Sequence, residues 1–225
     1  MTQPYRIIMH ETGGPDVLKA EPFEPRAPGP GEVLVRQSAA GLNFIDTYHR
    51  SGLYPVKLPF TPGGEGAGIV QAVGEGLTHL KPGDAVAYMG SATYATHFTG
   101  PAARMIPLPA DISPQEAAAI LLKGLTAWML LFEIRPLQAG ETALVWAPVG
   151  GVGSVLITGY EGVSEKVRDL TGGKGVDVVY DSVGKISAEE SLSSLRPRGW
   201  FISYGNASGP VDPIAPVRLL QGGSL

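Results

Sequence analysis

The sequence predicts a mixed α/β protein in which a small β-barrel is followed by an open sheet of parallel strands and helices. Three observations carry this prediction. Short β-rich runs separated by glycine and proline turns fill roughly residues 1–110, helical patterns begin after Asp111, and an apolar run ends in a glycine-rich segment at residues 147–153. A chain of 225 residues is long enough to bury a core in each of two domains.

The first domain is expected at residues 1–112 and consists of short strands. Its β-branched and aromatic runs are bounded by turn signals, such as GPG at residues 29–31 and KPGD at residues 81–84. Runs of this length and spacing are typical of a small, irregular barrel. The expected strands are residues 5–10, 32–38, 68–73, 85–88 and 94–98.

The second domain is expected at residues 113–225 and opens with a helix. Ser113 fits the N-cap, Pro114 the first helical position and Glu116 the third, and together they form a capping box. Gly124 separates two apolar helical runs, and farther along strand-like and helix-like runs alternate, which predicts a parallel sheet. The expected helices are residues 115–122, 125–133, 164–170 and 188–195, and the expected strands are residues 142–147, 176–180 and 200–204.

A nucleotide-binding turn is predicted at residues 147–153 (APVGGVG), directly after an apolar strand. In a Rossmann unit, such a turn lets the backbone approach a dinucleotide pyrophosphate at the N-terminus of the next helix. The three glycines permit this approach, whereas Pro148 withdraws one N–H donor. Residues 154–163 are too short and too glycine-broken for the following helix and second strand. The predicted Rossmann domain is therefore incomplete.

The composition excludes several function classes. The net charge is −4 and the basic residues are scattered, so nucleic acid is not an expected partner. The chain has no cysteine, and its four histidines are not spaced as a helical metal pair, so we expect neither a metal site nor thiol chemistry. No apolar run approaches the length of a membrane span, and the N-terminal residues do not form a signal peptide. We therefore expect a cytoplasmic protein that does not enter a membrane.

Five stretches resemble, in the same order, motifs of the zinc-independent medium-chain dehydrogenase/reductases. The most specific one is residues 41–54, which read GLNFIDTYHRSGLY. The others are residues 62–68 (PGGEGAG), 122–127 (LKGLTA), 179–184 (VYDSVG) and 203–209 (SYGNASG). Within this family the chain is most similar to the NADPH:quinone oxidoreductase group, which is zeta-crystallin-like, and the similarity covers almost every residue.

This resemblance implies a GroES-like catalytic domain followed by a Rossmann cofactor domain. It further implies NADPH as the cofactor, a small-molecule quinone as the substrate, and a homodimer. Zinc alcohol dehydrogenases polarise a carbonyl with a metal whose ligands include cysteine, whereas this chain has Asp46 in the region of one such ligand. Because quinone reduction is strongly driven and the cofactor carries the difficult step, the expected hydride transfer needs no metal.

The expected catalytic residues are Asn43, Tyr48 and Tyr54. The resemblance implies that the Asn43 amide and the Tyr48 phenol face the nicotinamide and the quinone oxygen, while the Tyr54 ring lines the entrance. Tyr48 can pass a proton to the reduced oxygen, and water can serve equally well. The alternative is that these tyrosines lie on a barrel strand or turn as packing residues with a hydrogen-bonded tip.

The expected cofactor-binding residues follow the strands of the second domain. The resemblance implies that Thr126, at the start of a helix turn, bonds the ribose or the carboxamide. Asp181 lies too far from the glycine-rich turn to be a ribose ligand and is expected to cap the end of its strand. The alternative for the residues that follow the strands is that they only form turns at the strand ends and bind no cofactor. The further expected ligands are Gly150, Gly151, Val152, Gly153, Val183, Gly184, Tyr204, Gly205 and Asn206.

The chain departs from the family in length. Members are longer by on the order of a hundred residues, of which about 45 are expected between Val155 and Tyr160 and the rest after Leu225. The internal part would hold the first Rossmann helix, the second strand and the basic residues that bind the 2′-phosphate, and the final part would hold the edge used for dimerisation. One explanation is that the polypeptide lacks the internal segment. The other, which we expect, is that the sequence joins two stretches across a chain break near residues 155–159.

Other functions remain open at this point. An enoyl or alkenal reductase of the same superfamily would share the cofactor site and differ in the acceptor pocket. A protein of another class would be a non-enzymatic truncated remnant, or a crystallin-type or RNA-binding protein, although the acidic charge opposes RNA binding. The mass of the intact protein distinguishes the remnant from the enzyme, because a mass near 23.5 kDa means that the Rossmann segment is missing.

Overall fold

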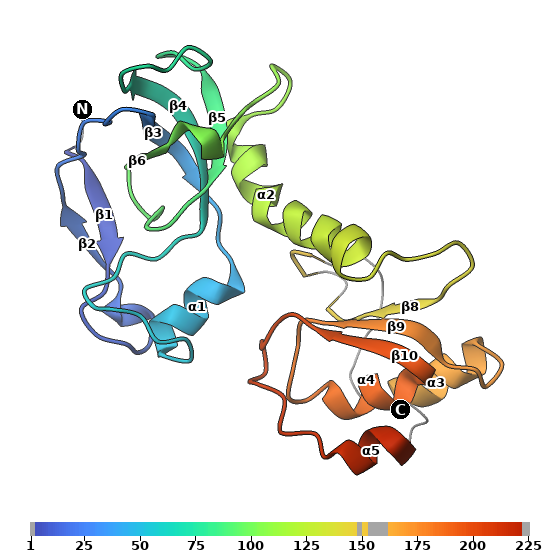
Figure 1. Cartoon of the computed structure of the whole chain (residues 1–225). Helices are drawn as coiled ribbons and strands as arrows, with labels where there is room; N and C mark the ends of the chain where they lie inside the picture. The colour runs from blue at the N-terminus through green and yellow to red at the C-terminus, as the bar shows by residue number, and fades with distance from the viewer. Residues whose placement is uncertain (1–2, 148–149, 153–161, 222–225) are drawn as a thin grey trace. The chain divides into compact units, whose positions relative to one another are not determined.

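A computed structural model describes residues 3–147, 150–152 and 162–221 of the chain (Figure 1). The chain divides into two compact units, Met1–Leu125 and Thr126–Leu225. The expected chain break near residues 155–159 lies outside the described residues, as do Pro148 and Gly153 of the glycine-rich turn.

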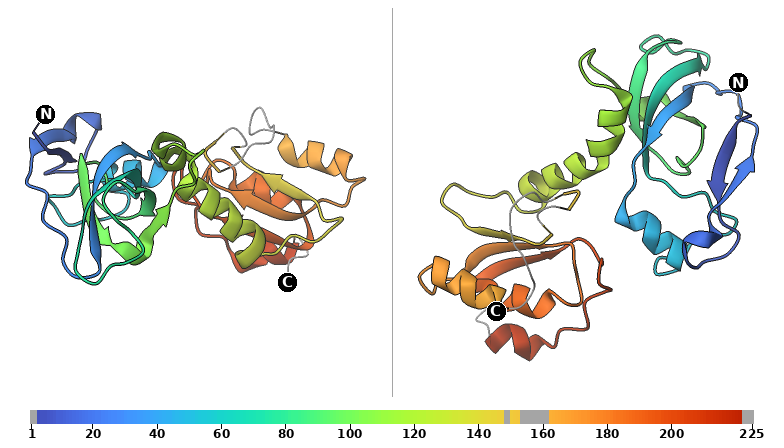
Figure 2. Two further views of the ribbon diagram at one scale, coloured as in Figure 1. Left: turned by 90° about the horizontal axis from the view of Figure 1, so that it is seen from above. Right: turned by 180° about the vertical axis from the view of Figure 1, so that it is seen from behind.

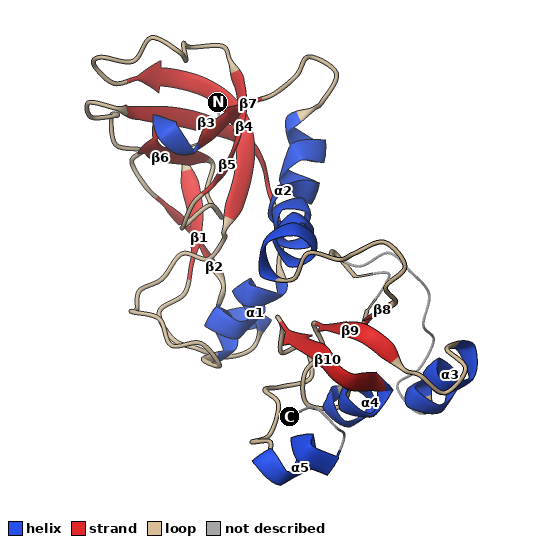
Figure 3. Cartoon of the chain, turned by 45° about the vertical axis from the view of Figure 1, so that its right-hand side comes forward, coloured by secondary structure: helices blue, strands red, loops and turns tan. Residues whose placement is uncertain are grey.

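The first unit is built on a five-stranded antiparallel sheet with the strand order β6-β3-β4-β5-β7 (Figure 3). A separate antiparallel pair, β1 with β2, completes its strands. The mixed α/β class with a strand-rich first domain is thereby confirmed. The strands are β1 (Tyr5–Ile8), β2 (Lys19–Pro22), β3 (Glu32–Ala40), β4 (Glu65–Val73), β5 (Ala85–Met89), β6 (His97–Pro101) and β7 (Met105–Pro107).

One predicted strand of the first unit is displaced. Residues 94–98 were expected to form a strand, but β6 begins only at His97. The preceding residues pair with β1 instead, because Ile7 N donates to Tyr94 O and Thr96 N donates to Tyr5 O. This short run of residues therefore pairs with strands of two different sheets.

The core of the first unit follows the alternation of its strands. Val33 and Val35 on β3 are fully buried and pack with residues of the neighbouring strands. Side chains on a strand alternate between two faces, so residues two positions apart share the buried face. The other buried members of this core are Val70, Leu80, Val86, Tyr88, Ala102 and Met105.

Helix α1 (Phe44–Ser51) follows β3 and was not expected from the sequence. It begins after Asn43, whose extended backbone is typical of an N-cap, and ends at Gly52 with φ of 83°. Short 3-10 turns lie at Pro15–Val17 and Ala102–Arg104, and most of the next helix, Pro114–Trp128, also belongs to the first unit.

Helix α2 (Pro114–Trp128) confirms the predicted capping box. Glu116 N donates to Ser113 Oγ at 3.2 Å, and Ser113 N donates to Glu116 Oε2 at 2.8 Å. The predicted interruption at Gly124 is wrong, because the helix continues through it and passes into a π-helical turn at Met129–Ile134. A single glycine costs a helix only about 1 kcal/mol, which is too little to break it.

Continuity through Gly124 also corrects the expectation on apolar length. The helical segment Pro114–Ile134 has 21 residues and is long and apolar enough to cross a membrane, by length and composition only. The expected break at Gly124 had divided this segment into two shorter apolar runs. A core helix of a soluble protein can meet the same criteria, so the finding does not by itself place the chain in a membrane.

The second unit is built on a three-stranded parallel sheet with the strand order β10-β9-β8. All six residues of the central strand, β9 (Val176–Asp181), are buried, as expected for a parallel strand covered on both faces. Figure 3 and the right view of Figure 2 show α3 and α4 on the same side of this sheet. The other elements are β8 (Ala143–Val145), β10 (Leu195–Ser203), α3 (Val163–Leu170), α4 (Ala188–Ser194) and α5 (Pro216–Gln221).

Candidate active site

The N-terminus of α1 is held by Asp46, the third residue of the helix. Its Oδ2 accepts the backbone N–H of Asn43 at 2.9 Å, which satisfies a donor that the helix itself cannot pair. Its Oδ1 accepts the N–H of Gly63 at 3.2 Å, and Oδ2 also accepts the Tyr94 hydroxyl at 2.8 Å. Three donors therefore fix this buried carboxylate, which ties α1 to the loop before β4.

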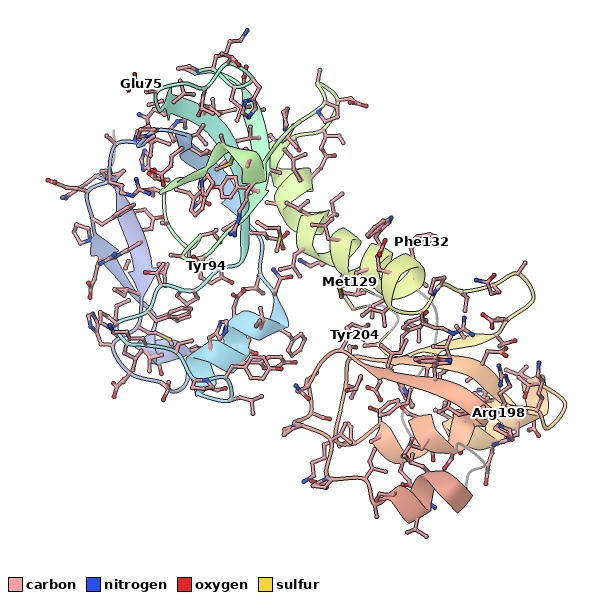
Figure 4. All side chains as sticks on the ribbon, viewed as in Figure 1. Glu75, Tyr94, Met129, Phe132, Arg198 and Tyr204 are labelled. Atoms are coloured by element: carbon pink, nitrogen blue, oxygen red, sulfur yellow. The ribbon has the colours of Figure 1, made fainter. Side chains whose placement is uncertain are left out.

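Tyr94 lies beside the loop before β4 (Figure 4). Burial, together with its hydrogen bond to Asp46, raises the pKa of the Tyr94 phenol, so the hydroxyl stays protonated and donates. Among the described residues, no group of three or more His, Asp or Glu side chains is placed to hold a metal ion. Asp46, which the resemblance implied to stand in the region of a zinc ligand, caps the N-terminus of α1 in this structure.

The Asn43 amide lies in a cluster with two charged side chains. Its Nδ2 donates to Glu65 Oε1 at 2.7 Å, and its Oδ1 accepts from Lys123 Nζ at 3.1 Å. Glu65, the first residue of β4, is fully buried and forms an ion pair of 3.4 Å with Lys123. Neither charged residue was predicted as part of the site, although both lie inside the stretches that resemble the family motifs.

Tyr48 and Tyr54 form an aromatic pair at the other end of α1. Their ring centroids are 5.1 Å apart, and Tyr54 N donates to Tyr48 O at 3.1 Å. Tyr48 lies on α1 and not on a barrel strand or turn, so the alternative placement is wrong for this residue. The Tyr48 side chain is buried, whereas Tyr54 is exposed. The structure thus places Asn43 at the N-cap of α1, Tyr48 within the helix and Tyr54 shortly after its end, all in the first unit.

In the second unit, the predicted cofactor residues gather at the carboxyl ends of parallel strands. Ala147, which follows β8, has φ of 52°, and its carbonyl oxygen accepts the N–H of Gly150 at 2.8 Å. Gly150 and Gly151 are exposed, and Val152 packs against the core with residues such as Val178. Exposed glycines at this edge of a parallel sheet are suited to the close approach of a phosphate.

The turn after β9 confirms the capping role of Asp181. Its Oδ1 accepts the backbone N–H groups of Val183 at 2.8 Å and Gly184 at 3.0 Å. Gly184 has φ of 92°, and a Cβ there would collide with the carbonyl oxygen of Gly209. Only glycine fits this left-handed, closely packed position.

The turn after β10 is bound to the turn after β9. Tyr204 N donates to Asp181 O at 2.8 Å, and Ser208 N donates to Val183 O, also at 2.8 Å. Tyr204 stands at the start of this turn, followed by Gly205 and Asn206 (Figure 4). Burial raises the pKa of the Tyr204 phenol. The structure therefore brings the predicted residues of both turns together.

Asp181 also anchors a buried polar network that the sequence did not reveal. Its carboxylate accepts hydrogen bonds from the hydroxyls of Ser187 and Ser191, each at 2.7 Å to Oδ2. The Ser191 hydroxyl in turn accepts the indole N–H of Trp146 at 2.6 Å. This network joins α4 to the ends of β8 and β9, and so fixes the strand ends from which the predicted ligands project.

Thr126 is placed differently from its prediction. It lies within α2, two residues before the end of the helix, and does not begin a helix turn. Its side chain is half-buried. The difference follows from Gly124, which does not break the helix.

The described residues fit a nicotinamide dinucleotide. Its pyrophosphate would meet the exposed backbone of Gly150 and Gly151 after β8, and the joined turns at Gly184 and Asn206 would border it. Ligands of open α/β sheets bind outside the carboxyl ends of the strands, which is where these turns lie.

Two family models match the chain. The alcohol dehydrogenase GroES-like domain matches residues 29–110, and the zinc-binding dehydrogenase domain matches residues 151–223. The quinone oxidoreductase of Pseudomonas aeruginosa is 42% identical and is aligned with 98% of this chain and 79% of its own length. That alignment spans 256 residues, more than the 225 of the chain, so the relative carries internal residues that have no counterpart here.

Solved structures of similar proteins share the fold. The quinone oxidoreductase of Pseudomonas syringae pv. tomato DC3000 is 40% identical, with a TM-score of 0.92, over 99% of this chain and 79% of that one. The Escherichia coli quinone oxidoreductase, solved in complex with NADPH, is 38% identical, with a TM-score of 0.88, over 98% of this chain and 79% of that one. The chain therefore belongs to the medium-chain dehydrogenase/reductase family, within its quinone oxidoreductase group.

Proposed function

We propose that this protein is an NADPH-dependent quinone reductase that works without a metal. The observation that carries the proposal is the arrangement of α1. An amide at its N-terminus and an aromatic pair at its other end come from one segment, and the only carboxylate between them is engaged by three donors. The segment thus offers hydrogen-bonding and aromatic groups to a planar carbonyl compound, with no carboxylate left to bind a metal.

The chemistry is a two-electron reduction. NADPH supplies a hydride, and one further proton converts the quinone to a hydroquinone. In this proposal the Asn43 amide hydrogen-bonds a carbonyl oxygen, and the Tyr48 phenol, or a water molecule, delivers the proton to the reduced quinone oxygen. The Tyr54 ring, which contacts Tyr48, lines the approach of the quinone. The residues mainly hold the reacting groups in place, which can supply a large part of the rate enhancement.

The cofactor is proposed to bind along the carboxyl ends of the second unit's strands. Gly150, Gly151 and Val152 would hold the pyrophosphate, together with Gly153, which lies outside the described residues. Thr126 would bond the ribose or the carboxamide. The remaining proposed contacts come from Val183, Gly184, Tyr204, Gly205 and Asn206.

A comparison of acceptors tests this function. The purified protein, with its intact mass measured, is mixed with NADPH and either a benzoquinone or an α,β-unsaturated aldehyde. Quinone reductase activity is supported if NADPH is consumed only with an added acceptor and faster with the quinone than with the aldehyde. A faster reaction with the aldehyde would favour an alkenal reductase. From the family resemblance we further propose a homodimer in the cytoplasm, and light scattering after size-exclusion chromatography tests the dimer.

A further inference from the structure

We propose that Glu65 and Lys123 are positioning residues that hold the Asn43 side-chain amide in one orientation. The amide nitrogen faces Glu65 and the amide oxygen faces Lys123, so that the second N–H of the nitrogen is presented to a carbonyl oxygen of the bound ligand. The identity of that ligand, a quinone or the nicotinamide carboxamide, rests on the proposed function. The orientation of the amide rests on the structure alone.

The donor and acceptor chemistry of the two neighbours sets this orientation. An ammonium group can only donate hydrogen bonds, and a carboxylate can only accept them. Asn43 Oδ1 accepts from Lys123 Nζ at 3.1 Å, and Asn43 Nδ2 donates to Glu65 Oε1 at 2.7 Å. A flipped amide would place its N–H groups against the ammonium and its oxygen against the carboxylate. Both hydrogen bonds would be lost and replaced by repulsion.

Glu65 is itself held rigidly. Its other carboxylate oxygen, Oε2, accepts the backbone N–H of Leu122 in α2 at 2.7 Å. The Glu65 backbone carbonyl accepts the Gly41 N–H at 3.2 Å and the Thr93 hydroxyl at 2.9 Å. The side chain is fully buried, so water does not compete for its lone pairs. Glu65 therefore gives the amide a fixed point of reference from β4 and α2.

Lys123 completes the arrangement through its three N–H groups. They meet Leu42 O at 3.2 Å, Asn43 Oδ1 at 3.1 Å and Glu65 Oε1 at 3.4 Å. All three donors of the ammonium are thus engaged within the protein. For this reason we assign Lys123 to positioning of Asn43 and not to direct binding of an anionic ligand.

Side-chain amide resonances of the 15N-labelled protein, recorded without cofactor, test the orientation directly. Loss of one resonance pair in Asn43→Ala assigns the Asn43 amide. We expect this pair to exchange slowly with solvent in the parent protein, and to move toward the position of an exposed amide in both Glu65→Gln and Lys123→Met. Asp177→Asn is the matched control, because it breaks another buried carboxylate–cation pair, with Arg196 at 2.6 Å, in the second unit. It should leave the Asn43 resonances unchanged.

Steady-state kinetics test the consequence for catalysis. We expect Glu65→Gln and Lys123→Met each to lower kcat with quinone by about tenfold to hundredfold, because a small misplacement of a positioned group has effects of this size. NADPH affinity, measured by fluorescence titration, should change much less. Since both residues act through Asn43, neither substitution should lower kcat further in an Asn43→Ala background. Lys123→Arg retains a cationic donor and should restore most of the lost activity.

The two readouts separate the possible failures. Unchanged Asn43 resonances in both variants, or losses of kcat that simply add to that of Asn43→Ala, would overturn the inference. If Glu65→Gln fails to fold, the comparison of Lys123→Met with Lys123→Arg decides, because Lys123 is less buried than Glu65. If the parent protein folds but consumes no NADPH with quinones, the proposed function fails, while the resonances still decide the orientation.

Discussion

Asn43 donates a hydrogen bond of 2.7 Å to Glu65, a fully buried carboxylate 22 positions farther along the chain. This contact joins the start of α1 to the first residue of β4. Room for it depends on Gly41, since a Cβ at this position would collide with the Glu65 carboxylate and with the carbonyl oxygen of Ala118. The site therefore requires a glycine two residues before the amide that it positions.

Gly41→Ala is expected to lower the free energy of unfolding by about 1–3 kcal/mol, because the added methyl group overpacks a filled space. The matched control is Gly124→Ala, whose Cβ would meet no heavy atom within 4 Å. Gly124 lies inside α2, so this control should raise stability by roughly 0.5–1 kcal/mol. Chemical denaturation measures the free energy of unfolding of both variants and shows whether each is less or more stable than the parent protein. Equal effects would show that the space at Gly41 is not restricted.

Tyr48→Phe is expected to lower kcat/KM with quinone by an amount equivalent to about 1–3 kcal/mol of barrier, which is typical of one positioned hydrogen bond or proton donor. NADPH affinity should stay nearly the same, because the ring still packs against Tyr54. Initial rates measured over a range of quinone concentrations give kcat/KM, and a titration of NADPH binding gives the cofactor affinity.

A second tyrosine provides the control for that substitution. Tyr88 is fully buried in the core of the first unit, and its hydroxyl donates to Gln37 at 2.6 Å. Tyr88→Phe should cost about 1 kcal/mol of stability and leave quinone kinetics unchanged. Unaltered kinetics in Tyr48→Phe as well would mean that Tyr48 is a packing residue.

Asp46→Asn is expected to destabilise the protein by about 1–3 kcal/mol, because an amide nitrogen would replace one of the two oxygens that accept three hydrogen bonds. Thermal unfolding at neutral pH measures the loss. Asp16→Asn, at an exposed position, is the comparison and should have little effect. Equal stability of the two variants would refute the capping role of Asp46.

The contribution of Glu32 to stability should depend on pH. Its hydrogen bonds with Arg26 and with the N–H of Gly29 lower the pKa of the Glu32 carboxyl from 4.5 to about 2. Because the folded-state pKa is lowered, the contribution is present above the unfolded value of 4.5 and is lost as the pH falls toward 2. The difference in Tm between the parent protein and Glu32→Gln should therefore shrink across this range, and a constant difference would contradict the assignment.

Local patterns in the sequence predicted most of the fold. The capping residues Ser113 and Glu116 marked the start of α2, and turn signals bounded most strands of the first unit, because these features depend on neighbouring residues alone. Helix α1 was missed because its aromatic and polar residues have low helix propensity. Its signals were nevertheless present, with Asn43 at the N-cap and Gly52 after the last turn.

The site was predicted less completely, because part of it depends on long-range contacts. Asn43, Tyr48 and Tyr54 lie within twelve consecutive residues, so one motif pointed to all of them. The neighbours Glu65 and Lys123 are 58 positions apart, and only the pairing of β3 with β4 and the placement of α2 bring them together. No local pattern indicates that two charged residues so far apart share one amide.

The most direct test of this account is quinone-dependent oxidation of NADPH by the purified protein, with the intact mass determined in parallel and a strong chelator present. We predict that NADPH is consumed only when a quinone is added, that the chelator leaves the rate unchanged, and that Tyr48→Phe slows the reaction. A folded protein with a mass near 23.5 kDa that consumes no NADPH with any quinone would contradict the account and favour a non-enzymatic remnant.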